Sequence, residues 1–381
     1  MKKFNHLTSA LGFIEKRLAE RKINGLYREL RKDNDLIDFS SNDYLGFARS
    51  VELKSEVENE LKNSSLYKNG SSGSRLLTGN SDYIENTERF IASLHSSEAG
   101  LMFNSGYDAN LGLFSSVPQR GDAVILDELA HASIIDGTRL SFANRFSFKH
   151  NDLESLESRL KQAKGTCYVG IESVYSMDGD LAPLEDISQL TEKYSANLIV
   201  DEAHAVGLFG FGLTDNTVKE KIFARVVTFG KALGCHGAIV LGCTSLRNFL
   251  INYARSFIYT TAAPPHQVAS VKMAYERLQR SDAEIEKLKE NIRLFKQHVH
   301  YRDQYKLINS DSAIQCLLLN NNEKAKNAAL QLQTVGLDVR AILSPTVPEN
   351  SERIRICLHS FNTQEEILLL TDTINKITDA E

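Results

Sequence analysis

The stretches Val200-Asp-Glu-Ala-His204 and Thr228-Phe-Gly-Lys-Ala-Leu-Gly234 decide the fold that this sequence predicts. The first contains the end of the apolar run Asn197-Leu-Ile-Val, and the second begins within the apolar run Arg225-Val-Val-Thr-Phe. Open α/β sheets bind their ligands at the carboxyl ends of such strands. We therefore expect Asp201 at a ligand-binding sheet edge. Lys231 lies between two glycines, which suits imine chemistry with a flat carbonyl compound.

Short apolar runs alternate with longer helical patterns from about residue 50 to 280, which predicts an α/β fold with a largely parallel sheet covered by helices on both faces. We predict an N-terminal arm over residues 1–50, a large domain over 51–280 and a small α+β domain over 281–381. The expected strands of the large domain contain Asp122-Ala-Val-Ile-Leu, Thr166-Cys-Tyr-Val-Gly-Ile, Asn197-Leu-Ile-Val, Arg225-Val-Val-Thr-Phe and Gly237-Ala-Ile-Val-Leu.

The arm contains a polar helical pattern within residues 5–30, and the charged stretch from Val268 to His300 predicts one long connecting helix. Thr363 and Glu366 form a capping box before a final amphipathic helix. Three further strands are expected in the small domain, over Ser312 to Asn320, Leu337 to Leu343 and Arg353 to His359.

Composition excludes several classes of protein. The chain has 381 residues, 42% hydrophobic and 24% charged, which is ordinary globular usage. A net charge of -5 argues against a broad nucleic-acid surface. No apolar run approaches the roughly 20 residues of a bilayer span, and no signal core follows the first residues. Five cysteines without a C-x-x-C pair favour a reduced, cytoplasmic setting, and no metal is expected.

Lys231 in isolation is most simply a surface lysine in a turn. Its neighbours favour chemistry instead. Thr228 can donate a hydrogen bond to a phosphate, and Gly230 and Gly234 let the backbone approach a flat ring closely. Burial and nearby positive charge would lower the pKa of the amine, so that Lys231 could act as both nucleophile and base.

Asp201 has two further interpretations. It could cap a helix that follows it, or its carboxylate could keep a pyridinium nitrogen protonated and so support an electron-accepting ring. In the second case His204 would face the phenolic oxygen of the cofactor, and pyridoxal phosphate (PLP) would form a Schiff base with Lys231. Asp-Glu-Ala-His also occurs in helicases, but the required loop G-x-x-x-x-G-K-[ST] is absent from this sequence.

Polar residues after other expected strands complete the candidate site. The ring of His131 could stack on the pyridine face. The segment Asn104-Ser-Gly106-Tyr107 opens a helix, where free N–H groups suit a phosphate and Tyr107 could form a second aromatic wall. Ser176 ends a third strand and could donate to cofactor or substrate, although Met177 to Asp180 also has the composition of a plain turn.

These segments carry a resemblance to the α-oxoamine synthases, which are fold type I PLP enzymes, and it extends over nearly the whole chain. The matching motifs are Phe39-Ser-Ser-Asn-Asp-Tyr-Leu-Gly46, His131, Ser176-Met-Asp-Gly-Asp180, Asp201-Glu-Ala-His204 and Thr228-Phe-Gly-Lys231. Further segments are similar to the branch that works in biotin synthesis: Ile258-Tyr-Thr-Thr261 with Pro264-Pro265, Ser312-Ala-Ile-Gln315 and Ser344-Pro-Thr-Val-Pro348 through Arg353-Ile-Arg355.

The resemblance implies a role for each candidate residue. Lys231 would carry PLP, Asp201 would pair with the pyridinium, His131 would stack and His204 would contact the phenolic oxygen. The family is an obligate homodimer with shared sites, so Thr260 or Thr261 would reach the neighbouring subunit's phosphate. Arg355 would bind the amino acid carboxylate, unless Arg353 and Arg355 are only the polar face of an edge strand. The remaining cofactor contacts would be Gly106, Tyr107, Ser176 and Thr228, and the further substrate contacts would be Arg28, Asn42 and Thr346.

The implied reaction is the decarboxylative condensation of L-alanine with a pimeloyl thioester of CoA or of a carrier protein. Sister branches join glycine or serine to other acyl-CoA substrates, and a non-catalytic member of the fold is a third hypothesis. The sequence departs from the biotin branch at Leu343, where several members have arginine. The resemblance therefore does not extend to an arginine contact with the acyl chain at that position, and Arg340 is the candidate substitute.

Overall fold

The computed structural model describes residues 2–30, 35–214, 218, 221–302 and 304–380. The chain divides into two compact units, Met1–Leu36 and Ile37–Glu381. The first unit contains helix α1 (Lys2–Ile23), which confirms the helix predicted near the N-terminus. Apolar side chains including Leu11, Phe13 and Ile14 are exposed on it. No helix in the described part of the chain is long and apolar enough to cross a membrane.

The second unit is built on a seven-stranded sheet with the order β2-β8-β7-β6-β5-β3-β4. All neighbouring strands are parallel except at β8, which runs antiparallel to both β2 and β7. The predicted α/β class with a mostly parallel sheet is therefore confirmed. The strands are β2 (Ala99–Phe103), β3 (Ala123–Asp127), β4 (Asn144–Phe148), β5 (Cys167–Glu172), β6 (Asn197–Asp201), β7 (Ile222–Thr228) and β8 (Ala238–Gly242).

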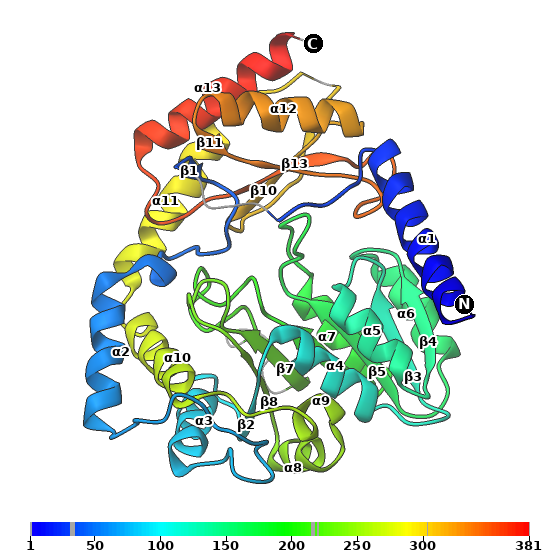
Figure 1. Ribbon diagram of the computed structural model, residues 1–381, viewed down its shortest axis with the longest axis vertical. Coiled ribbons are helices and arrows are strands. Elements are labelled where there is room, and N and C mark those ends of the chain that lie inside the picture. Colours follow the sequence, from blue (N-terminus) through cyan, green and yellow to red (C-terminus); the bar gives the residue numbers. More distant parts are fainter. Residues whose placement is uncertain (1, 31–34, 215–217, 219–220, 303, 381) are drawn as a thin grey trace. The chain divides into compact units, whose positions relative to one another are not determined.

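Helices cover both faces of this sheet (Figure 1). Alternate residues of one strand point to opposite faces, so Val124 and Leu126 pack on one side while Ala123 and Ile125 pack on the other. The first side is covered by α4 (Gly106–Ser116), α5 (Ala132–Leu140), α8 (Thr244–Tyr253) and α9 (Arg255–Ile258). The second side is covered by α6 (Leu153–Gln162) and α7 (Leu184–Lys193).

The single long helix predicted over Val268 to His300 is wrong, because the chain forms α10 (Pro265–Leu278) and α11 (Asp282–His298). The hydroxyl of Ser281 donates to the carbonyl of Arg277 at the break. Side-chain bonds of serine to a carbonyl four residues back often bend helices. The other elements that pack near α10 are η1 (Phe47–Arg49), α2 (Val51–Asn63) and α3 (Asp82–Leu94).

An antiparallel sheet with the order β12-β13-β10-β9 follows α11. The strand predicted from Leu337 to Leu343 is split, because β11 pairs with β1 while β12 pairs with β13. The capping box at Thr363 and Glu366 is confirmed by its two reciprocal hydrogen bonds. The elements are β1 (Ile37–Asp38), β9 (Lys306–Leu307), β10 (Ile314–Leu318), β11 (Leu337–Asp338), β12 (Arg340–Ile342), β13 (Arg353–Cys357), α12 (Asn322–Thr334) and α13 (Gln364–Ala380). The domain boundaries at residues 50 and 280 stay predictions.

Candidate active site

The carboxyl ends of four strands bring polar groups to one edge of the large sheet. Asp127 ends β3, Glu172 ends β5, Asp201 ends β6 and Thr228 ends β7. Glu172 and Asp201 are direct partners in the strand register. Lys231 follows β7 in a tight turn that is closed by the backbone bond from Gly234 N–H to the carbonyl of Lys231.

The amine of Lys231 is joined to the second sheet by a chain of hydrogen bonds. Its Nζ lies 2.8 Å from Nε2 of His204. On the other side of the imidazole, Nδ1 lies 2.7 Å from the hydroxyl of Tyr44. Tyr44 donates to Oδ1 of Asn42 at 3.1 Å, and Nη2 of Arg355 donates to the same oxygen at 3.1 Å. Segments that are far apart in sequence therefore meet at Lys231.

Burial lowers the pKa of both Lys231 and His204. It lowers the pKa of Lys231 to about 8, an effect that the charge of Asp201 opposes and the charge of Arg355 reinforces. Burial, followed by the nearby positive charge of Lys231, also lowers the pKa of His204 well below its usual range. At neutral pH the imidazole is therefore uncharged, and Lys231 is close to its titration point.

Asp201 is held by two donors. Its Oδ2 accepts from Nδ2 of Asn110 at 2.7 Å, and its Oδ1 accepts from the backbone N–H of Ala203 at 2.9 Å. Residues 203–206 form turns, so Asp201 does not cap a helix and that alternative is wrong. Asn110 also donates to Ser133, whose hydroxyl lies 2.7 Å from Nδ1 of His131. One amide thus connects the carboxylate with the segment that carries His131.

The N-terminus of α4 forms a cradle with the end of β7. Ser105 caps the helix by accepting from the N–H of Asp108 at 3.0 Å. A Cβ at Gly106 would overlap Oγ1 of Thr228, so only glycine allows this approach. Free N–H groups of a helix N-terminus next to a hydroxyl donor fit a phosphate. Asn104 extends the cradle by donating to Oγ1 of Thr260 at 2.9 Å and to the carbonyl of Thr261 at 2.9 Å.

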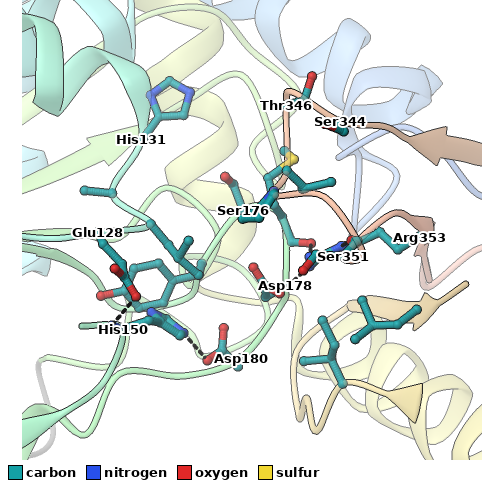
Figure 2. Close-up of a pocket in the computed structure, with 18 of the residues that line it drawn as sticks. Glu128, His131, His150, Ser176, Asp178, Asp180, Ser344, Thr346, Ser351 and Arg353 are labelled. Carbon is teal, nitrogen blue, oxygen red and sulfur yellow. Dashed lines mark hydrogen bonds and ion pairs between the residues drawn. The ribbon is translucent and has the colours of Figure 1, made fainter. Parts of the chain in front are cut away.

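A cavity of about 1310 Å³ opens beside His131 and Ser176. Figure 2 shows both residues at its wall, with Ser344 and Thr346 on a neighbouring segment. Apolar side chains contribute to the same wall: Leu129, Ile135, Leu181, Ile308, Leu318 and Val347. A mainly apolar cavity of this size can accept an acyl chain.

Two ion-pair groups hold the polar part of that wall (Figure 2). Arg353 pairs with Asp178 and donates to the carbonyl of Ser351. His150 lies 3.0 Å from Asp127 and 2.7 Å from Asp180. Burial acts against the charged form of His150, but its two carboxylate partners prevail and raise its pKa to about 10. His150 is therefore a cation at neutral pH.

Arg353 and Arg355 do not lie on an edge strand, so that alternative is wrong. Their strand β13 runs between β12 and β10, and both side chains are buried. Nε of Arg355 donates to the carbonyl of Ser176 at 2.8 Å, and Nη1 lies 2.9 Å from Sγ of Cys357. The guanidinium group of Arg355 is thus fixed beside the lysine site.

Other predicted residues have simpler surroundings. Tyr107 is 43% exposed and donates to Asp136. Thr346 is exposed at the cavity, and Arg28 is exposed in the first compact unit. Arg340 donates to Asp338 at 2.7 Å. The roles assigned to these residues stay predictions.

Four contributing residues were not predicted from sequence: Tyr44, Asn110, Ser133 and Glu172. Tyr44 lies inside a quoted motif, Ser133 is two residues after His131, and Glu172 directly follows the predicted strand that ends at Ile171, so these three positions carried a signal. Asn110 lies inside α4 without a polar neighbour that would mark it.

The chain resembles known proteins in both sequence and structure. Residues 34–374 match the family described as aminotransferase class I and II. A protein of Emericella nidulans named 8-amino-7-oxononanoate synthase is 40% identical, over 97% of this chain and 94% of its own. A solved structure of 8-amino-7-oxononanoate synthase from Francisella tularensis is 27% identical, with TM-score 0.75 and coverage of 91% and 99%. A serine palmitoyltransferase variant of S. paucimobilis with bound PLP–myriocin aldimine is 25% identical, with TM-score 0.87 and coverage of 98% of both chains.

Proposed function

Because the chain belongs to the aminotransferase class I and II family, and within it to the group that contains 8-amino-7-oxononanoate synthase, we propose that it condenses L-alanine with a pimeloyl thioester. The products are 8-amino-7-oxononanoate, carbon dioxide and the free thiol of CoA or of a carrier protein. The observation that carries this proposal is the amine of Lys231, held 2.8 Å from His204 at the sheet edge where Asp201 ends β6.

The residues present fit PLP. The cradle of Gly106 and Thr228 would hold its phosphate, Asp201 would face its ring nitrogen and His131 would cover its ring. When bound, PLP supplies a carbonyl carbon for attachment to an amine and a ring that stabilises negative charge at the α-carbon of an amino acid. The protein supplies orientation and proton transfer.

Lys231 acts as the base. A pKa of about 8 leaves a useful fraction of its Nζ uncharged near neutral pH, so Nζ can accept the α-proton of alanine and later return a proton to the product. Arg355 would receive the alanine carboxylate as a bidentate partner. Alanine would thus be held by its carboxylate while its α-proton faces Lys231.

The acyl chain would occupy the cavity beside Ser176. Its wall is apolar over Leu129, Ile308 and Val347, which suits the methylene chain of the pimeloyl group. Burial of the chain would exclude water from the thioester, so that carbon–carbon bond formation is favoured over hydrolysis. Release of carbon dioxide makes the overall reaction effectively irreversible.

We also propose a homodimer with shared active sites in the cytoplasm. The support for the dimer is membership of the family. Thr260 and Thr261 would complete the partner's phosphate site, and they lie beside Asn104 at the cradle. Sedimentation of the purified protein with and without PLP tests the assembly.

The decisive assay measures thiol release from pimeloyl-CoA by the PLP-loaded protein with L-alanine, glycine or L-serine. Fast release with alanine alone supports the proposal. Release only with glycine or serine, or only with another acyl group, assigns the protein to a sister reaction. If no amino acid gives thiol release and the protein binds no chromophore, the enzyme hypothesis is overturned.

A matched pair of variants connects the assay to the site. Lys231→Ala should abolish thiol release and leave the fold intact, because the covalent attachment point and the base are lost together. Lys272→Ala removes a lysine that pairs with Glu60 on α2 and should keep full activity. Near-normal turnover by Lys231→Ala contradicts the assigned role.

A further inference from the structure

The proton arrangement around His204 follows from which partners can only donate. Arginine has no acceptor atom, so the atom of Asn42 that faces Nη2 of Arg355 is the carbonyl Oδ1. That oxygen also lies 3.1 Å from the hydroxyl of Tyr44. Two oxygens at this distance require one hydrogen between them, and Tyr44 is the partner that has it.

The single hydroxyl hydrogen of Tyr44 is therefore committed to Asn42. The 2.7 Å contact between Tyr44 and Nδ1 of His204 then needs its hydrogen from the imidazole. An uncharged imidazole has one N–H, so Nε2 has a free lone pair and accepts from Nζ of Lys231 at 2.8 Å. In the reverse arrangement, the Tyr44–Asn42 contact would contain no hydrogen. Only one direction of hydrogen-bond donation satisfies every contact from Arg355 to Lys231.

We propose that Tyr44 is a positioning residue, which keeps the proton of His204 on Nδ1 so that Nε2 stays an acceptor for the amine of Lys231. The direction is set at the far end of the chain by Arg355, through Asn42. The catalytic meaning of this inference rests on the proposed function, in which Arg355 binds the carboxylate of alanine. A bare Nε2 stabilises the ammonium form of Lys231, and a protonated Nε2 would oppose that form.

The same chain contains a natural reference with the opposite tautomer. Nη2 of Arg225 lies 3.0 Å from Nδ1 of His95, so this nitrogen is the acceptor, and Nε2 of His95 lies 2.9 Å from the hydroxyl of Tyr275. Both histidines are buried and both contact a buried tyrosine. The proton thus lies on Nδ1 in His204 and on Nε2 in His95.

Nitrogen NMR of isotope-labelled histidine in the full-length protein without cofactor reads these tautomers directly. Loss of signals in His204→Gln and His95→Gln assigns them. We expect His204 protonated at Nδ1 and His95 at Nε2. A proton on Nε2 of His204 in the unmodified protein overturns the proposal.

Four variants test what sets the tautomer. Tyr44→Phe should move a measurable share of the His204 proton to Nε2, and Tyr275→Phe should leave His204 unchanged. Asn42→Asp keeps the acceptor and should keep Nδ1–H. Asn42→Leu removes the acceptor, frees the Tyr44 proton for Nδ1 and should move the His204 proton to Nε2. An unchanged His204 pattern in both Tyr44→Phe and Asn42→Leu contradicts the proposal.

The rate at which PLP attaches to Lys231 gives a second reading. Attachment needs the free amine, so its rate rises with pH through the pKa of Lys231, which burial sets near 8. In Tyr44→Phe the midpoint should move lower, by up to about one pH unit, which is a tenfold change in the ratio of amine to ammonium. A midpoint that stays or rises contradicts the proposal. Neither experiment uses a substrate, so both are independent of thiol release.

Discussion

Glu172 and Asp201 lie side by side in the register of the parallel strands β5 and β6, and both side chains are buried. Burial first, and the charge of Asp201 second, raise the pKa of Glu172 to about 8. The positive charge of Lys231 and the backbone N–H groups of His131 and Ser176 oppose this rise in pKa. Glu172 is thus a protonated acid at neutral pH, which keeps a second negative charge away from Asp201.

Glu172→Gln should flatten the dependence of stability on pH. Between its ordinary pKa of 4.5 and the folded value of about 8, Glu172 binds a proton in the folded chain and not in the unfolded chain. Stability from this group is therefore complete below pH 4.5 and declines as the pH rises to about 8. A neutral amide removes this decline. Urea unfolding at several pH values measures it, and the exposed Glu286→Gln on α11 is the control. An unchanged slope in Glu172→Gln contradicts the assignment.

Asp201→Asn should keep the fold and lower turnover by on the order of a hundredfold, which is the typical effect of removing one charge-stabilising group. The amide keeps the shape that contacts Asn110 and loses the charge for a pyridinium nitrogen. Turnover by the PLP-loaded variant measures the loss. Asp186→Asn, on the exposed side of α7, should be silent. Equal turnover in both variants contradicts the role of Asp201.

Gly106→Ala should weaken PLP binding and leave the sheet intact. The added Cβ would meet Oγ1 of Thr228, so one wall of the cradle must move. Titration with PLP, followed by absorbance, should give an affinity about tenfold lower, which corresponds to 1.4 kcal/mol. Gly12→Ala has no heavy atom within 4 Å of its Cβ and is the control. Unchanged affinity in Gly106→Ala excludes the cradle as the phosphate site.

The sequence was sufficient for the central strands, because their apolar runs are buried on both faces and their carboxyl ends carry Asp201 and Thr228. The edge strand β4 was missed because its sequence Asn-Arg-Phe-Ser-Phe is largely exposed and has no continuous apolar run. The break between α10 and α11 was missed because the polar residues before Asp282 also fit a solvated helix face.

Site residues were predictable from the sequence only where a short motif contains the reacting groups. Lys231 and His204 lie in motifs whose residue types suggest a reaction. Tyr44 acts through a contact with a residue 160 positions later, and Asn110 through one 91 positions later. Such roles depend on which segments the sheet brings together, and a single sequence does not contain that information.

Arg355→Lys should raise the KM for alanine by roughly tenfold to a hundredfold, because a hydrogen bond to a charged group is worth about 1.5–3 kcal/mol. The ammonium keeps the charge and loses the planar fork that matches a carboxylate. It also releases the bonds to Ser176 and Asn42. Initial rates against alanine, at saturating acyl thioester, measure the change.

Ile308→Trp supplies the crossed control. Ile308 lines the cavity, and a larger ring there should hinder the acyl chain while the guanidinium of Arg355 stays in place. We expect Ile308→Trp to raise the KM for the acyl thioester and to change the KM for alanine little. If both variants raised the same KM, the two substrates would not bind separately. The distinction between a carboxylate site at Arg355 and an acyl site in the cavity would then be wrong.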